Sequence, residues 1–132
     1  MDISAETRRA LSDAGVIVAY LFGSRAGGSP RPTSDVDIAV LFDRPTGLLE
    51  RERLASRLAG TLGIADVDLV VLDDASLEIR GRVVQEGRVI FSADEPRRVA
   101  FEVDTRSRYL DFLPTLRALS RAYLKRVAER GL

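Results

Sequence analysis

The sequence predicts an α/β (α+β) fold in which a small mixed β-sheet is flanked by helices and followed by a helical C-terminal extension. Short apolar runs rich in β-branched residues alternate with segments whose apolar residues recur at helical spacing. The chain has 132 residues, 45% hydrophobic and 30% charged, which suits one domain with one core. We expect residues 1–93 to form the core and residues 94–132 a helical extension of the same domain.

The first elements are delimited by glycine. Residues 5–14 suit a short amphipathic helix that Gly15 ends. The run VIVAYLF at 16–22 is apolar throughout, so we predict a buried strand. Residues 23–34 are dense in glycine, serine and proline, which predicts an irregular loop.

The middle of the chain repeats the alternation of strand and helix. Residues 35–42 (DVDIAVLF) and 66–72 (DVDLVVL) predict strands, and each begins with the same acidic tripeptide. Between them, residues 46–60 carry leucine and alanine at helical spacing, which predicts a helix. Strands separated by helices favour a mixed sheet.

The last third is predicted to be mostly helical. Residues 76–87 suit a short helix with Ser76 as a possible N-cap, and residues 88–91 a minor strand. A long helical region is expected at about 94–130, which Pro114 should kink or split in two. Its apolar residues form a stripe that could pair with a partner helix. The stripe consists of Leu110, Leu113, Leu116, Leu119, Tyr123 and Val127.

Composition excludes several classes of chemistry. With no histidine and no cysteine, neither Ser-His-Asp nor Cys-His catalysis nor thiolate-bound zinc is available. No apolar run is long enough to span a membrane, and we expect a cytoplasmic protein. The net charge is zero and the arginines near the C-terminus are interleaved with the stripe, so direct nucleic-acid binding is not expected.

A pair of aspartates is the first candidate for chemistry. In a strand, residues two apart point to the same face, about 6.6 Å apart along the chain, so Asp35 and Asp37 project together. Neighbouring carboxylates repel each other, and a divalent cation relieves that repulsion. Magnesium is commonly held by one or two carboxylates and substrate phosphates. The pair therefore predicts a magnesium site.

A turn upstream of the pair could hold phosphate. Gly23 ends an apolar strand and lets the backbone approach a ligand closely. Ser24 adds a hydroxyl donor and Arg25 a positive charge. A helix that started here would point free N–H groups and its positive dipole end at an anion.

A third carboxylate is expected from the next strand. If residues 66–72 pair beside residues 35–42, an acidic side chain reaches the same end of the sheet. Asp66 and Asp68 share a face, so spacing alone does not choose between them. Either one could complete a metal shell and accept a proton from an attacking hydroxyl.

The segment FGSRAGGSPRPTSDVDIAV, with ten residues between Ser24 and Asp35, resembles the G-S-x10-D-x-D signature of minimal nucleotidyltransferases of the polymerase-β-like superfamily. In particular it resembles MntA-type antitoxins, which are encoded beside HEPN-domain RNase toxins. The resemblance implies that Gly23 and Ser24 hold the triphosphate. It further implies that Asp35 and Asp37 ligate magnesium and that Asp68, which lies within an apolar strand, is the third catalytic carboxylate. The loop departs from the family in its prolines and glycines.

The resemblance implies an enzyme that transfers AMP from ATP to a tyrosine hydroxyl of a HEPN toxin and so blocks its RNase activity. A protein acceptor is favoured over a small molecule because only about 40 residues follow the helix after the third strand. The competing hypotheses are a non-catalytic antitoxin that acts by binding alone and a nucleotidyltransferase that modifies a small molecule.

Overall fold

The computed structural model describes residues 2–23 and 36–130 of the chain. The predicted elements are confirmed, with boundaries that differ by two residues or fewer. Of the loop predicted at 23–34, only Gly23 lies within the described residues. The elements are α1 (Ala5–Asp13), β1 (Val16–Phe22), β2 (Val36–Phe42), α2 (Leu48–Leu62), β3 (Val67–Val71), α3 (Leu77–Glu86), β4 (Arg88–Ser92) and α4 (Glu95–Arg130).

The four strands form one sheet in the order β3-β2-β1-β4. β2 and β3 are parallel, which requires the crossover that α2 provides. β1 runs antiparallel to both of its neighbours, β2 and β4. The prediction of a mixed sheet is therefore confirmed.

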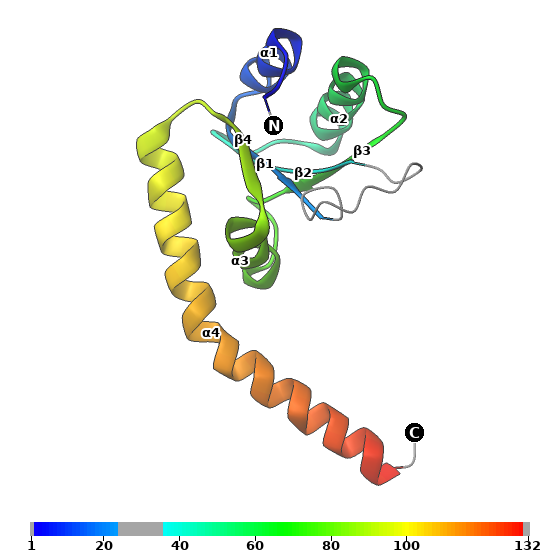
Figure 1. Cartoon of the computed structure of the whole chain (residues 1–132), viewed down its shortest axis with the longest axis vertical. Helices are drawn as coiled ribbons and strands as arrows, with labels where there is room; N and C mark the ends of the chain where they lie inside the picture. Colours follow the sequence, from blue (N-terminus) through cyan, green and yellow to red (C-terminus); the bar gives the residue numbers. More distant parts are fainter. Residues whose placement is uncertain (1, 24–35, 131–132) are drawn as a thin grey trace.

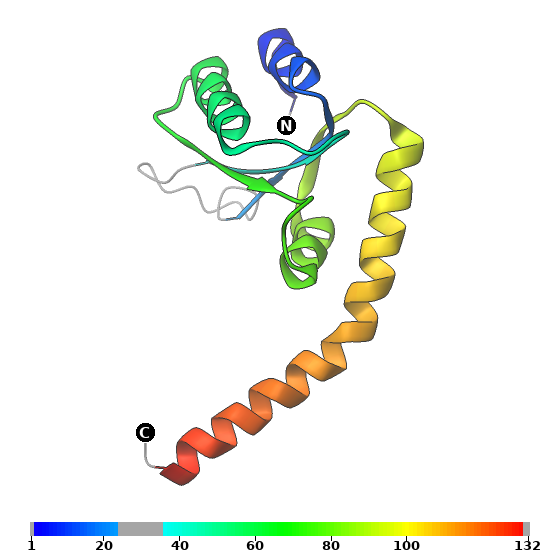
Figure 2. The ribbon, with the colours of Figure 1, turned by 180° about the vertical axis from the view of Figure 1, so that it is seen from behind.

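Helices cover both faces of the sheet (Figure 1 and, from behind, Figure 2). α1 and α2 pack on one face, and α3 with the first part of α4 packs on the other. Each face has its own apolar cluster. Val36, Ile38 and Val40 belong to the cluster beneath α1 and α2, because alternate residues of a strand face the same side of the sheet. Tyr20 and Val83 belong to the cluster beneath α3.

α3 begins as predicted. The Ser76 hydroxyl accepts a hydrogen bond from the backbone N–H of Ile79 at 3.2 Å, which confirms it as the N-cap. The helix ends at Glu86, and its C-terminal turn closes with a bond from Gly87 N–H to the Val83 carbonyl at 2.7 Å. β4 starts directly afterwards, so α3 lies against the end of β1 with little freedom.

α4 is one helix, with Pro114 inside it. Its ribbon bends in the orange part that contains Pro114 (Figure 1), so proline kinks the helix and does not split it. Before the bend α4 packs against α3 and β1, and after it the helix leaves the sheet. Among the described residues, none of the helices combines the length and apolar character needed to cross a bilayer.

A polar network fixes the first part of α4 on the sheet. The hydroxyl of Tyr20, in the centre of β1, donates to Glu102 Oε2 at 2.7 Å. Arg98 donates to both oxygens of Glu102 at 3.0 Å and also pairs with Glu95. Burial, and then the bond to Glu102, raise the pKa of Tyr20 far above its ordinary value. The hydroxyl therefore stays protonated and remains a donor.

Close packing of α3 on α4 depends on Gly81. A Cβ added there would collide with the ring of Tyr109, which is buried on the facing side of α4. Gly60, in α2, has open space around it and provides the contrast.

We expect Gly81→Ala to lower the free energy of unfolding by about 2 kcal/mol, because the added methyl group overpacks the α3–α4 contact. Gly60→Ala should instead raise it by about 0.5–1 kcal/mol, which is the usual gain from removing a glycine from a helix interior. Urea denaturation of the two variants measures both values. Equal gains in the two variants would show that α4 does not pack on α3 in solution.

Candidate active site

Gly23, Asp37 and Asp68 lie at one end of the sheet, where β1 ends and β2 and β3 begin. In the antiparallel pair, Phe22 of β1 lies opposite Asp37. In the parallel pair, Asp37 lies opposite Asp68. β2 thus places Asp37 between the end of β1 and the third predicted carboxylate.

Asp37 and Asp68 point to the same face of the sheet. Val36 and Ile38, on either side of Asp37, are buried beneath α1 and α2, so Asp37 faces the α3 side. Residues in register on neighbouring strands share a face, and Asp68 therefore projects beside Asp37. Asp37 is half-buried and Asp68 exposed, so a ligand from solvent can reach both.

Gly23 lies directly against Asp37. Its φ is +84°, in the left-handed region that favours glycine. A Cβ at this position would collide with the carboxylate of Asp37, with the nearest contact at Oδ2. The backbone of the predicted phosphate turn and the predicted metal ligand therefore touch, which brings together two features that are 14 positions apart in the sequence.

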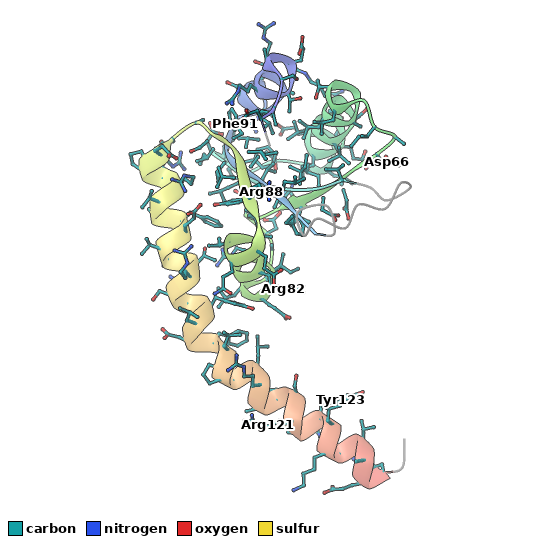
Figure 3. The ribbon with its side chains drawn as sticks, in the orientation of Figure 1. Asp66, Arg82, Arg88, Phe91, Arg121 and Tyr123 are labelled. Carbon is teal, nitrogen blue, oxygen red and sulfur yellow. The ribbon has the colours of Figure 1, made fainter. Side chains whose placement is uncertain are left out.

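Three of the predicted site residues, Ser24, Arg25 and Asp35, lie outside the described residues. Within the described part of the chain, no three acidic side chains group closely enough to form a metal site by themselves. Asp66 precedes β3, and Figure 3 places it on the segment that leads from α2 into this edge strand. It has no partner in the β2–β3 register within the described residues, whereas Asp68 lies opposite Asp37.

A small pocket adjoins the site on the α3 side. It has a volume of about 150 Å³ and is lined by Phe22, Gly23, Ile79, Arg82, Val83 and Glu86. Arg82 is exposed. Figure 3 shows it on α3, between the sheet and the distal part of α4. Sequence reasoning missed this arginine. The apolar pattern of α3 indicates that Val83 and Val84 are buried, but not that the neighbouring Arg82 lines the same pocket as Gly23.

Comparison with known proteins identifies the family of the chain. Residues 7–96 match the family described as Polymerase beta, Nucleotidyltransferase, and this segment contains Gly23, Asp37 and Asp68. The chain belongs to the polymerase beta nucleotidyltransferase family.

The most informative relatives are proteins of toxin–antitoxin systems. The protein adenylyltransferase MntA of Shewanella oneidensis is 39% identical over 90 residues, which is 68% of this chain and 63% of the relative. The match thus spans less than two thirds of that relative's length. A crystal structure of a toxin–antitoxin with AMP-PNP contains a chain with 31% identity and a TM-score of 0.75; the match covers 92% of this chain and 99% of that one.

A further structure shows a tri-AMPylated Shewanella oneidensis HEPN toxin in complex with an MNT antitoxin. There the matching chain has 30% identity and a TM-score of 0.68, with 88% of this chain and 91% of that chain covered. These similarities confirm the resemblance inferred from the G-S-x10-D-x-D segment and the expected nucleotidyltransferase fold.

We expect Gly23→Ala to abolish nucleotide binding by this site, because the new Cβ must displace the Asp37 carboxylate. Gly63→Ala is the matched control. Gly63 also has a positive φ, of 69°, so alanine pays a similar backbone strain of about 1 kcal/mol, but nothing lies within 4 Å of the added Cβ.

The measurement is the rise in melting temperature caused by ATP and magnesium. It should vanish in Gly23→Ala and persist in Gly63→Ala, although both proteins are less stable than the wild type. An unchanged rise in Gly23→Ala would mean that the nucleotide binds elsewhere.

Proposed function

We propose that the chain is a magnesium-dependent protein adenylyltransferase, an antitoxin that transfers AMP from ATP to a tyrosine hydroxyl of a cognate HEPN RNase toxin. The observation that carries the proposal is the register of β2, which sets Asp37 opposite Asp68 and against Gly23. The likeness to MntA and to AMP-PNP-bound toxin–antitoxin structures supports the choice of ATP and of a HEPN partner. Since ATP is the donor, we place the activity in the cytoplasm.

The residues present fit a magnesium ion. Asp37 and Asp68 offer oxygen ligands on one face, and Asp35, two positions before Asp37, would supply a third if the strand geometry extends to it. We therefore propose Asp35, Asp37 and Asp68 as metal ligands. Magnesium held there would neutralise charge on the triphosphate and on the leaving pyrophosphate.

The transfer requires one bond to form and one to break. The tyrosine oxygen attacks the α-phosphorus, and the bond from that phosphorus to the bridging oxygen breaks, so that pyrophosphate leaves with the electron pair. Asp68 is exposed and adjacent to Asp37, which suits it to accept the proton of the attacking hydroxyl. The half-buried Asp37 is better suited to a fixed role in ligand binding.

Gly23, Ser24 and Arg25 are proposed to hold the triphosphate. The glycine lets the backbone approach a phosphate, the serine offers a hydroxyl and the arginine a positive charge. We add Arg82 to this group, because it lines the pocket that Gly23 borders. Glu86, four residues later on the same helix and in the same pocket, is placed to orient the guanidinium.

We further propose that residues 1–93 form the catalytic core and residues 94–132 an extension that belongs to the same domain. The family match ends at residue 96, close to the start of α4. Because Tyr20 of the core bonds to Glu102 of α4, the two parts should unfold together.

The test of this function is transfer of label from α-labelled ATP, with magnesium, to a purified HEPN-domain toxin that binds this chain. Asp37→Asn should fold like the wild type yet reduce transfer at least about a hundredfold, because it removes several kcal/mol of charge stabilisation. Asp68→Asn should have a comparable effect, whereas Asp66→Asn, which precedes β3, should transfer at nearly the wild-type rate.

Two outcomes would count against the proposal. If the wild type silences the toxin but never labels it, the chain neutralises by binding alone. If Asp66→Asn is inactive and Asp68→Asn is active, the third carboxylate has been misassigned.

Arg82→Met should raise the dissociation constant of magnesium-ATP about tenfold, as expected for loss of one hydrogen bond to a charged group. Arg97→Met, which alters an exposed arginine in the first turn of α4, is the control and should bind ATP normally. Isothermal titration calorimetry measures both constants. Equal affinities would place Arg82 outside the triphosphate site.

A further inference from the structure

The distal segment of α4, residues 110–130, exposes several large apolar side chains. Leu110, Leu119, Tyr123 and Leu124 are each more than half exposed, at 51, 62, 61 and 63%. The segment is about 30 Å long at the rise of an α-helix. An exposed apolar surface of this size usually marks an interaction site.

One face of the distal segment continues a face that is buried earlier in the same helix. Thr105 and Tyr109 are buried, and Tyr109 packs against Gly81 of α3. Steps of four, three, seven and four residues lead from Tyr109 to Leu113, Leu116, Tyr123 and Val127, which lie on one helix face and which we call the distal stripe. Tyr123 is exposed, and the other three residues of the stripe are half-buried. The helix face that packs on α3 thus extends beyond α3 with its apolar character intact.

The bend at Pro114 directs this face toward the nucleotidyltransferase site. In both views the distal segment turns to the side of the molecule toward which β1 points, and β1 leads to Gly23 (Figures 1 and 2). Figure 3 shows Tyr123 on the side of the helix that faces α3 and Arg121 on the outer side. A protein bound to the distal stripe would therefore lie in front of the site.

The charge of the distal segment indicates which kind of partner surface it can bind. The distal segment carries Arg117, Arg121, Lys125, Arg126 and Arg130 against Asp111 and Glu129. Arg126 and Arg130 lie beside Tyr123 and Val127 in one shallow pocket. A complementary surface is apolar along its centre and acidic along its rim. A second copy of this basic helix would bring like charges together.

The small size of the site indicates that an acceptor protein is bound mainly by another surface of this chain. The pocket beside Gly23 has a volume of about 150 Å³, which is too small to grip a folded acceptor protein. In the toxin–antitoxin structure with AMP-PNP the match covers 92% of this chain, and the unmatched 8% is shorter than the distal segment. The relative therefore shares at least part of that segment.

We propose that the distal stripe docks the HEPN toxin, through a toxin surface that is apolar and flanked by acidic side chains, and so presents the acceptor tyrosine to Asp37 and Asp68. This inference rests on the proposed function for the identity of the partner. The stripe supplies affinity, and the carboxylates supply the chemistry. Modification and binding are accordingly separable by mutation.

The test compares two double variants of the full chain. Leu116→Glu with Tyr123→Glu places two carboxylates in the distal stripe, whereas Ala118→Glu with Ala122→Glu adds the same charge to exposed positions away from it. The stripe variant should raise the dissociation constant for the purified HEPN-domain toxin at least about tenfold. The control should change it by less than about twofold.

Both variants should keep the wild-type melting temperature and its rise with ATP and magnesium, since the distal segment lies away from the core. The stripe variant should label the toxin slowly at low toxin concentration and recover as the concentration is raised. A merely structural defect would not be rescued in this way.

Three results would separate the possibilities. If the stripe variant binds the toxin as tightly as the wild type, the docking inference is wrong, and label transfer decides the proposed function independently. If only self-association is lost, the stripe joins two copies of this chain and the inference is also wrong. If the wild type binds the toxin through the stripe but never labels it, docking stands and the proposed function fails.

Discussion

The register of β2 is the constraint on which the site depends. It sets Asp37 opposite Phe22 on one side and opposite Asp68 on the other, so a shift of one residue would turn Asp37 into the apolar cluster beneath α1 and α2. Val36, Ile38 and Val40 resist that shift because each is buried. The hydrophobic pattern of the strand thereby fixes the positions of two carboxylates that repel each other.

Contacts made by other elements of the fold stabilise that register at the end of β1. Gly23 can approach Asp37 only because it lacks a side chain and adopts a positive φ. β1 in turn is held by Tyr20, whose hydroxyl bonds to Glu102 on α4. α4 packs through Tyr109 on Gly81 of α3, the helix that carries Arg82 to the pocket. Packing contacts thus connect the long helix α4, through α3, to the pocket beside Gly23.

The sequence was sufficient to predict the elements and the mixed sheet, because hydrophobic periodicity is a local signal. The glycine–aspartate spacing predicted that Gly23 and Asp37 belong to one site, and the structure places them against each other. Spacing left Asp66 and Asp68 equivalent, the family resemblance favoured Asp68, and the β2–β3 register places Asp68 opposite Asp37. Arg82 could not be predicted, since its position beside Gly23 arises from how α3 crosses the sheet. The apolar stripe of α4 could be recognised in the sequence. Whether other parts of the chain pack against it also depends on how the helices are arranged, which the local pattern does not predict.

The small surface of the site explains the importance of the exposed part of α4. A catalytic end built from strand termini and one short helix has little surface with which to select an acceptor. Enclosing a small acceptor would require walls on several sides, but α4 leaves the sheet at Pro114 and adds none. A helix that projects past the site can instead bind a large partner over its length and leave the carboxylates open to the partner's own hydroxyl. The separation of α4 from the core is thus consistent with a protein acceptor and difficult to reconcile with a small one.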